Sequence, residues 1–464
     1  MTERSSFDDV SFAASAAPRL TPGVQRLTLL LLTVTYGFGF IDRVVIALVA
    51  QDLKAEFSLS DFEIGLLGGS AFAIVNAMVT LPIALLAERR PRTLVAAASL
   101  AIGSLFTTLC AVAGSFAHLL GARLGMAVGS AGTEAPAHSA ISDLYRPGQR
   151  ASALSVFMLG VPIASILGSF GGGMVAQAFG WRATFLAFGG IGLLVAMAGA
   201  VLMREPRRGD LPDHSAAGPA MHSVIATLWR ARHFRHILLA TALVSFASFG
   251  VNTFLPAFFA RAYGLDTGAA GLAFGVIAGI ASAIGSVAGG FGSEWLARRR
   301  PELLIGGPGL GLIVGTPLLM FGVTRPNLAV ALPIILVGSC FFYTAMAPAI
   351  ATMHGLLDSR SRALGSALFT LIVYLIGQGL GPPLAGWASD RFAAWHYGTA
   401  SYVDRCVGAA GQLSSPSCTT ASAAGLRDAI LCFALIYLLS ASHFLLAARR
   451  MRAVSSPADE ASLA

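Results

Sequence analysis

The chain contains twelve stretches that are each long and apolar enough to cross a lipid bilayer as a helix. A membrane-crossing helix needs about 20 mostly apolar residues, and its backbone groups must bond to each other because lipid offers them no partner. Only 12% of the residues are charged, against roughly 25% in soluble domains. The sequence therefore predicts an all-α membrane protein. The stretches are 27–51, 61–87, 93–114, 117–143, 150–177, 182–203, 234–260, 268–296, 302–323, 327–355, 361–388 and 425–448.

The positive charges lie mainly on one side of these predicted spans. With the N-terminus inside, 22 of the 31 Lys and Arg residues fall in inner segments and 7 in outer ones, while Arg43 and Arg123 fall inside spans. Cytoplasmic loops of membrane proteins carry such an excess of Lys and Arg. We therefore expect an even number of spans, both termini in the cytoplasm, and a bacterial inner membrane as the location. This topology also accounts for the net charge of +8, so nucleic acid is not an expected partner.

Short patterns recur in the two halves of the chain. QRASALSVF (149–157) is similar to SRALGSALF (361–369), which lies 212 residues later. Repeated halves are typical of transporters, which place the substrate site between the halves near the middle of the membrane. The sequence thus predicts two pseudo-symmetric six-helix bundles. We divide the chain into a cytoplasmic tail (1–26), a first bundle (27–203), a cytoplasmic linker (204–233), a second bundle (234–448) with an outer loop (389–424), and a second tail (449–464).

The inner loop ALLAERRPR (84–92) resembles the signature loop of the major facilitator superfamily, which runs Gly, three residues, Asp, Arg, one residue, Gly, Arg. Arg89 and Arg92 match this pattern, and Glu88 stands in place of the Asp. GFGSEWLARRRP (290–301) is similar to the second copy of the loop, with Gly290 and Glu294 in frame. This resemblance implies twelve transmembrane helices that expose a central cavity to each side of the membrane in turn.

Two further stretches are similar to the spinster-like transporters within that superfamily. IDR (41–43) resembles their acid–arginine pair in the first span, and GSAGTEAPAHSAISDLY (129–145) resembles their fourth span. The spinster-like pattern has Gly at the position of Thr133. The resemblance implies a lipid-like substrate and a proton-coupling and gating role for Asp42, Arg43 and Glu134.

Charged side chains inside a span are costly, by about 2.5 kcal/mol or more for each residue at the bilayer centre, and they usually mark a transport pathway. Asp42 and Arg43 are neighbours on one helix and point about 100° apart, so they cannot share one face. Glu134 is an alternative partner for Arg43 if spans 1 and 4 pack together. We interpret the three residues as a proton switch in which the arginine moves between two acids. A permanent structural ion pair is the alternative.

The fourth predicted span carries three polar side chains. Arg123, Glu134 and His138 are spaced so that a continuous helix would place them on one face. His138 could join a proton relay, because its charge changes near neutral pH, or it could be a hydrogen-bonded packing residue. Arg123 could be structural or could bind an anionic group.

Acids and arginines also gather at the inner ends of the predicted helices. We expect them to form ion pairs that close the cytoplasmic gate, a role that the family resemblance favours. The alternative is that the arginines serve only to orient the protein in the membrane. The gate candidates are Glu88, Arg89, Arg92, Glu294 and Arg298.

Other polar residues are candidates for the cavity, although each could equally be a packing residue. They are Tyr36, Asn76, Arg123, Asn252, Tyr343, Tyr374 and Gln378. In the outer loop, Cys406 and Cys418 could form a disulfide, because a periplasmic location permits one. The spacing of these cysteines allows the bridge but does not require it.

Together these features predict a secondary transporter rather than an enzyme, with the proton as coupling ion and no metal or other cofactor. The expected substrate is an amphipathic lipid-like molecule or an organic anion, and the expected form is a monomer in the bilayer. Efflux of drugs or metabolites is an alternative within the same class. A membrane sensor with a transporter fold is a rival from another class.

Overall fold

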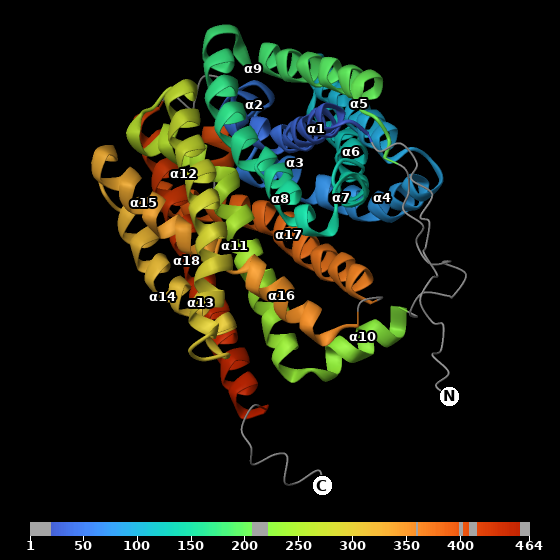
Figure 1. Ribbon diagram of the computed structural model, residues 1–464. Coiled ribbons are helices and arrows are strands. Elements are labelled where there is room, and N and C mark those ends of the chain that lie inside the picture. The colour runs from blue at the N-terminus through green and yellow to red at the C-terminus, as the bar shows by residue number, and fades with distance from the viewer. Residues whose placement is uncertain (1–19, 207–220, 359–360, 399–401, 408–414, 455–464) are drawn as a thin grey trace, which may run out of the picture.

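The computed structural model describes residues 20–206, 221–358, 361–398, 402–407 and 415–454, and these residues form helices joined by short connections (Figure 1). The side chain of Asp42 lies outside the description, as do parts of both predicted tails, of the predicted linker and of the predicted outer loop.

The first half of the chain contains the helices that correspond to predicted spans 1 to 6. One long helix, α9, includes Gly180 with a φ of 82°, so the chain turns there and Figure 1 shows two rods. The helices are α1 (Pro22–Leu48), α2 (Ala50–Phe57), α3 (Asp61–Gly68), α4 (Ser70–Arg89), α5 (Arg92–Cys110), α6 (Phe116–Ala131), α7 (Ala135–Leu144), α8 (Pro147–Met158) and α9 (Gly160–Leu202).

The second half begins with a short helix, α10 (Met221–Arg230), that is too short to cross a membrane. Predicted spans 7 to 12 follow it. They correspond to α11 (Arg232–Tyr263), α12 (Thr267–Val287) with η1 (Ala288–Gly292) and α13 (Ser293–Ala297), α14 (Leu303–Val323), α15 (Leu328–Phe342) with α16 (Met346–Leu356), α17 (Arg362–Tyr397), and α18 (Pro416–Val454), with η2 (Val403–Val407) before α18.

Ten described segments are long and apolar enough to span a membrane, and they account for eleven of the twelve predicted spans. One of them, Ser152–Leu202, covers two predicted spans because it contains the turn at Gly180. The predicted fourth span is divided between α6 and α7, neither of which is long enough alone. The predicted fold class is therefore confirmed.

The internal repeat extends to the breaks inside the spans. The fourth span is interrupted between Ala131 and Ala135, and the tenth between Phe342 and Met346. The two breaks are 211 residues apart, close to the 212-residue offset of the sequence repeat. A broken helix leaves backbone groups free to bond to something other than their own helix, which is why transporters use such breaks at functional positions.

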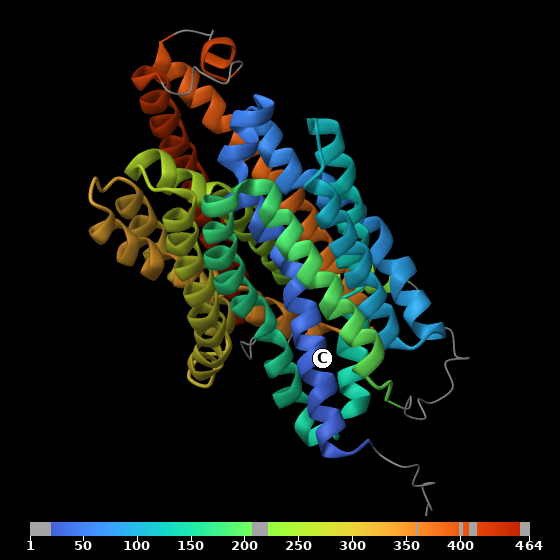
Figure 2. The same ribbon diagram turned by 90° about the horizontal axis from the view of Figure 1, so that it is seen from above.

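We use "terminal end" for the end of the bundle where α1 begins and "distal end" for the opposite end, where α3 begins. At the distal end the two halves pack closely, α3 against α17 and α9 against α12. Gly65 makes this possible, because a Cβ there would collide with the backbone of Pro382. Towards the terminal end, α7 and α8 pack mainly against the first half, and α10 and α16 against the second. Figure 2 shows the blue-to-green first half mainly beside the yellow-to-red second half.

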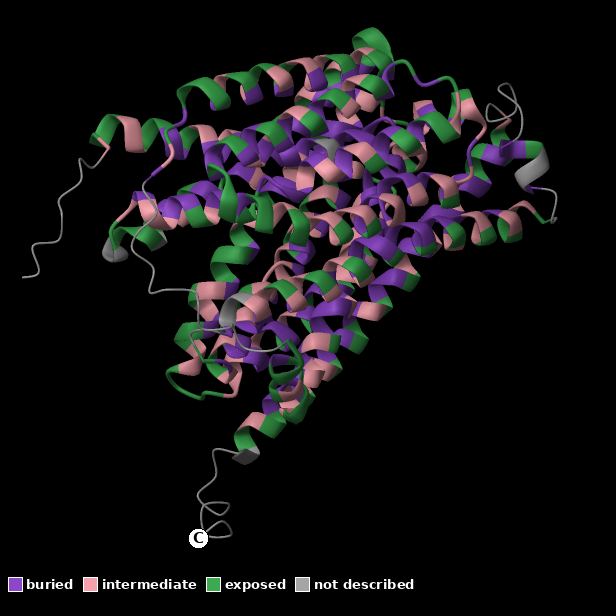
Figure 3. Ribbon diagram, turned by 90° about the vertical axis from the view of Figure 1, so that its right-hand side faces the viewer, coloured by how far each residue is buried: buried purple, intermediate pink, exposed green. Residues whose placement is uncertain are grey.

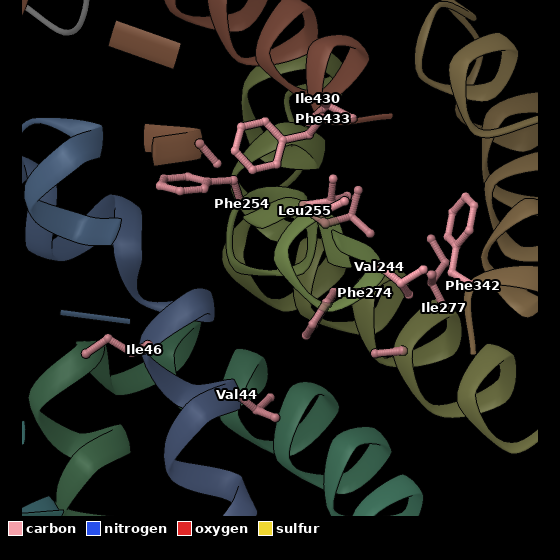
Figure 4. Close-up of a cluster of buried hydrophobic side chains, with 14 of the residues drawn as sticks. Val44, Ile46, Val244, Phe254, Leu255, Phe274, Ile277, Phe342, Ile430 and Phe433 are labelled. Atoms are coloured by element: carbon pink, nitrogen blue, oxygen red, sulfur yellow. The ribbon is translucent and has the colours of Figure 1, made fainter. Parts of the chain in front are cut away.

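The core runs through both halves. Figure 3 shows buried residues along the middle of the bundle and exposed ones along the outside, as expected for helices that face lipid. One large cluster of buried apolar side chains includes residues of α1 and of the second half, and Figure 4 shows some of them, among them Val44 and Ile46 of α1 and Phe274 and Ile277 of α12. The two halves are thus held together by apolar packing as well as by polar contacts.

Candidate functional site

Arg43 lies where three helices of the first half meet one helix of the second. Its NH2 donates a long hydrogen bond of 3.4 Å to Ser130 Oγ. Its guanidinium carbon lies 4.8 Å from the ring centre of Phe72 and 5.8 Å from that of Tyr374. The Nε atom is buried without a hydrogen-bond partner among the described residues. Aromatic faces can hold a cation, but they do not neutralise its charge.

Glu134 does not pair with Arg43 in this structure. No described carboxylate lies within ion-pair distance, 4.0 Å, of the arginine. Glu134 is exposed at the break between α6 and α7, where it is the residue just before α7. It is nevertheless near enough to interact electrostatically with Tyr36 and Tyr374. Arg43 therefore reaches the fourth span as predicted, but it contacts Ser130 and leaves the acid unpaired.

The helix is broken between Arg123 and Glu134, so Arg123 does not share a continuous helical face with Glu134 and His138, whereas these two stay one turn apart, with the His138 N–H donating to the Glu134 carbonyl. Gly132 ends α6, and Pro136 near the start of α7 favours a new helix because it lacks an N–H that would otherwise need a partner. Arg123 is fully buried and donates from Nε to the carbonyl of Leu67 at 2.9 Å. It therefore connects spans 2 and 4 inside the first half.

Two aromatic residues, Phe72 and Phe157, contact the charged and polar side chains described above. The guanidinium of Arg123 lies 5.4 Å from the ring centre of Phe72, whose ring Arg43 also approaches. Phe157 stacks on Tyr36 at 4.6 Å and contacts His138 edge to face at 5.2 Å. We call the residues Tyr36, Arg43, Phe72, Glu134, His138, Phe157 and Tyr374 the Arg43 cluster.

Other predicted cavity residues are spread over both halves. Asn252 of α11 donates to the hydroxyl of Tyr343 at 3.1 Å, and Tyr343 follows α15 at the break in the tenth span. Asn76 donates to the carbonyl of Ala127 at 3.3 Å, so it helps to pack α4 on α6. Gln378 is buried in the close contact of α17 with α3. The structure thus brings Tyr36 and Tyr374 to the Arg43 cluster and gives Asn76 and Gln378 packing positions.

Arg92, one of the predicted gate residues, is buried in a network inside the first half. It pairs with Asp143 at 2.6 Å and with Glu205 at 2.8 Å, and it donates to Ser139. Burial alone would raise the pKa of Glu205, but hydrogen bonds from Thr93 and Arg92 outweigh it and lower that pKa. These contacts tie α5 to α7 and to the segment after α9, without reaching the second half.

The remaining gate candidates, Glu88, Arg89, Glu294 and Arg298, are exposed at the terminal end. Glu294 and Arg298 form no ion pair with a described residue. Among the described residues no ion pair joins Glu294 or Arg298 to the first half, so a gate that uses them would have to form in another conformation.

The structure reveals a polar contact between the halves that the sequence did not predict. Asp61 at the start of α3 accepts two hydrogen bonds from Arg261 of α11, at 2.6 and 2.7 Å, and one from Lys54 at 2.7 Å. Ser389 of α17 donates to the same carboxylate at 2.7 Å. Asp390 accepts from the backbone N–H groups of Asp61 and Phe62. We call Lys54, Asp61, Arg261, Ser389 and Asp390 the distal clamp.

The clamp carries one sequence signal that could have revealed it. Lys54 is the only lysine in the chain, and it lies seven residues before an acid that begins a predicted span. Sequence reasoning assigned Lys54 and Arg261 only to outer loops as topology signals, and so it missed that both pair with Asp61. The side chains of Lys54 and Asp61 are each 2% exposed, and that of Arg261 is 8% exposed.

The outer cysteines lie together in the structure. Cys406 of η2 and Cys418 near the start of α18 form a disulfide, with their Cα atoms 5.5 Å apart. Cys110, Cys340 and Cys432 are free. The bridge therefore fastens the segment between α17 and α18 to the distal end.

Broken spans, paired halves that close at one end, and a charged cluster where the halves meet define a multi-pass membrane transporter. The family model of the Major Facilitator Superfamily matches residues 31–382. The chain belongs to that superfamily, whose members are transporters rather than enzymes, and both predictions from the sequence are confirmed.

The chain is also similar to individual transporters. It is 29% identical over 356 residues to an MFS-type efflux pump of Mycolicibacterium smegmatis, covering 76% of this chain and 81% of the relative. It is 26% identical to the sphingosine-1-phosphate transporter SPNS2 of Mus musculus, covering 76% of this chain and 67% of the relative. The predicted resemblance to spinster-like transporters is confirmed.

A solved structure resembles the fold closely. It is a bacterial homolog of the human lysosomal transporter spinster in an inward-facing, unoccupied conformation. The match has a TM-score of 0.83 and 29% identity, and covers 93% of this chain and 98% of the other. The closed distal end described above is consistent with an arrangement of this kind.

Proposed function

We propose that this protein is a proton-coupled transporter of an amphipathic molecule with an anionic group, and that the Arg43 cluster couples the proton to the substrate. The observation that carries the proposal is a half-buried cation at the meeting point of the halves, with its Nε atom buried and no carboxylate partner among the described side chains. A charge held this way in a membrane protein is costly, so its retention points to a ligand or to a partner that changes.

The geometry supports a switch rather than a permanent ion pair. Arg43 touches Ser130, which precedes Glu134 by four residues, and it faces Tyr374 across the boundary between the halves. An anionic headgroup between the halves would neutralise Arg43 and leave Glu134 free to bind a proton. When Arg43 turns to Glu134 instead, the acid is favoured in its charged form and releases the proton.

His138 supports the same interpretation from the first half. Its Nε2 atom is buried without a hydrogen-bond partner among the described residues, and it interacts electrostatically with Glu134. An imidazole can pass a proton between its two nitrogens. Asp42, adjacent to Arg43, serves as the second acid of the switch.

The aromatic residues around Arg43 favour a substrate with an apolar part. The half-buried rings of Phe40 and Tyr374 lie 5.4 and 5.8 Å from the guanidinium carbon and offer apolar surface next to the cation. The named substrate of the SPNS2 relative, sphingosine-1-phosphate, combines an anion with an apolar chain. The similarity to an efflux pump supports a second candidate, export of an apolar drug or metabolite.

Proteoliposome flux tests the coupling. Glu134→Gln should abolish proton-driven uptake while leaving the protein folded, and Glu302→Gln, a carboxylate remote from the cluster, is the matched control. Unchanged pH dependence of flux in both Glu134→Gln and Asp42→Asn would contradict the switch.

A thermal-shift screen of the purified protein tests the substrate class. Anionic lysophospholipids, fatty acids and aromatic acids are compared with cationic sphingoid bases and cationic drugs. Stabilisation by the anionic amphiphiles that disappears in Arg43→Ala would support the proposal. Stabilisation only by cationic drugs would favour efflux.

A further inference from the structure

The short helix α10 presents an apolar surface that no described part of the protein covers. Val224 and Leu228 are buried against the second half, where α10 packs on α11, α16 and α17. Met221, Ile225 and Trp229 are instead 50%, 46% and 61% exposed. Figure 1 shows α10 crossing the terminal end next to α16.

The buried and exposed apolar residues of α10 form one continuous strip. At about 100° per residue, Val224, Leu228, Met221, Ile225 and Trp229 occupy an arc of about 140° on the helix. One side of this arc packs on the protein and the other does not. The opposite face carries Ser223, Thr227 and Arg230, all of them exposed. Apolar and charged faces on one helix are typical of helices that lie in a membrane interface.

The position of α10 along the chain fixes its depth in the membrane. One residue, Ala231, separates Arg230 from α11, and the spanning segment begins at Arg232. The helix therefore lies beside the terminal end of a spanning helix, where the lipid headgroups are expected. Tryptophan is enriched at this depth, because its ring is apolar and its N–H is polar.

Positive charge surrounds the strip. The guanidinium carbon of Arg235 lies 5.9 Å from the ring centre of Trp229, and Arg232 is exposed beside it. Basic residues at the membrane surface attract anionic lipids by roughly 1 kcal/mol each. We propose that α10 is a membrane anchor that inserts Met221, Ile225 and Trp229 into the leaflet on the terminal side and binds anionic headgroups through Arg232 and Arg235.

This anchor acts on the second half of the transporter. α10 contacts α16 and α17, and α17 is also the helix that packs on α3 of the first half. Insertion would hold the terminal end of the second half at a fixed height in the membrane. The lipid surface itself, not the transported substrate, is the ligand.

Fluorescence labelling of two neighbouring positions tests the insertion. In a background with Cys340→Ser and Cys432→Ser, Ile225→Cys samples the apolar strip and Thr227→Cys samples the polar face as the matched control. Each variant is labelled with an environment-sensitive dye and reconstituted in nanodiscs of phosphatidylcholine with or without phosphatidylglycerol. Quenching by spin-labelled lipid and by aqueous iodide is measured, and the melting temperature confirms folding.

We expect the dye at position 225 to be quenched by lipid and protected from iodide, with the reverse at position 227. Equal quenching by iodide at both positions would overturn the anchor, as would protection of position 225 from both quenchers, which would mean that protein covers it.

The charge part of the proposal has its own test. Quenching at position 225 by spin-labelled phosphatidylglycerol should exceed that by spin-labelled phosphatidylcholine, and the preference should fall about fivefold with each of Arg232→Gln and Arg235→Gln. Equal quenching by the two lipids in the unsubstituted background would overturn the binding of anionic headgroups.

Discussion

The distal clamp and the Arg43 cluster both place arginines where the two halves meet, but only one of them is neutralised. In the clamp, Arg261 is paired with Asp61 through two short hydrogen bonds, and Lys54 and Ser389 each donate a further hydrogen bond to the same carboxylate. In the cluster, the described residues give Arg43 one long hydrogen bond, to Ser130, and three nearby aromatic rings. The charges of the clamp are paired and hold the two halves together, whereas the charge of Arg43 has no described acidic partner.

The largest expected effect is on the clamp. Asp61→Ala removes the acid that two buried cations share, and breaking a buried ion pair costs about 3–5 kcal/mol because it leaves charge uncompensated. We expect a lower melting temperature and a distal end that opens more often, measured as modification of a cysteine placed at Ser389. Asp61→Ala combined with Arg261→Ala should recover part of the stability. A single variant as stable as the wild type would contradict the role of the clamp.

The opposite result is expected for Arg43. Because no described carboxylate pairs with it, Arg43→Ala should change the melting temperature little while reducing transport by about ten- to a hundredfold, the value of a charge-assisted hydrogen bond to substrate. Flux in proteoliposomes and thermal unfolding are measured on the same preparation. Arg43→Lys is the control that keeps the charge. If Arg43→Ala destabilises the protein as much as Asp61→Ala does, the contrast between the two regions fails.

Sequence reasoning predicted the fold well because lipid restricts the choice. Span lengths, charge asymmetry and the repeat all follow from residues that can be counted, and the break near Tyr343 follows the same repeat as the one near Gly132. The site was harder. The spacing of Arg123, Glu134 and His138 assumed one continuous helix, and nothing in the spacing alone showed that α6 ends at Ala131.

The clamp was missed for a different reason. Lys54 and Arg261 are 207 positions apart in the chain, and only the closed packing of α3 on α17 brings Asp61 between them. Each of these cations lies near the end of a predicted span, where positive charge is ordinarily explained by topology. Pairing between distant residues depends on the tertiary structure, and a single sequence does not contain it.

A network inside one half provides an intermediate case. Glu205 is held by Arg92 and Thr93, which lower its pKa relative to the unfolded chain. Its contribution to stability is therefore present above pH about 4.5 and is lost as the pH falls through the lower folded value. Glu205→Gln should cost about 1–3 kcal/mol at neutral pH, the value of a hydrogen bond to a charged group. The cost should shrink at pH values below 4, measured by thermal unfolding; a cost independent of pH would mean that the charge is unimportant.

The smallest effect is expected from an exposed pair at the distal end, close in the chain to the clamp. Glu56 accepts from Arg182 at 2.8 Å and from Trp181 at 2.7 Å, and these bonds lower the pKa of Glu56. The side chains of Arg182 and Glu56 are 45% and 39% exposed, so water screens the attraction. Arg182→Gln should change the free energy of unfolding by at most about 1 kcal/mol. The Arg182–Glu56 and Arg261–Asp61 ion pairs have the same shortest N–O distance, 2.6 Å. The exposed pair should nevertheless contribute much less to stability, because the two pairs differ in burial. A loss as large as that of Asp61→Ala would show that burial does not set the difference.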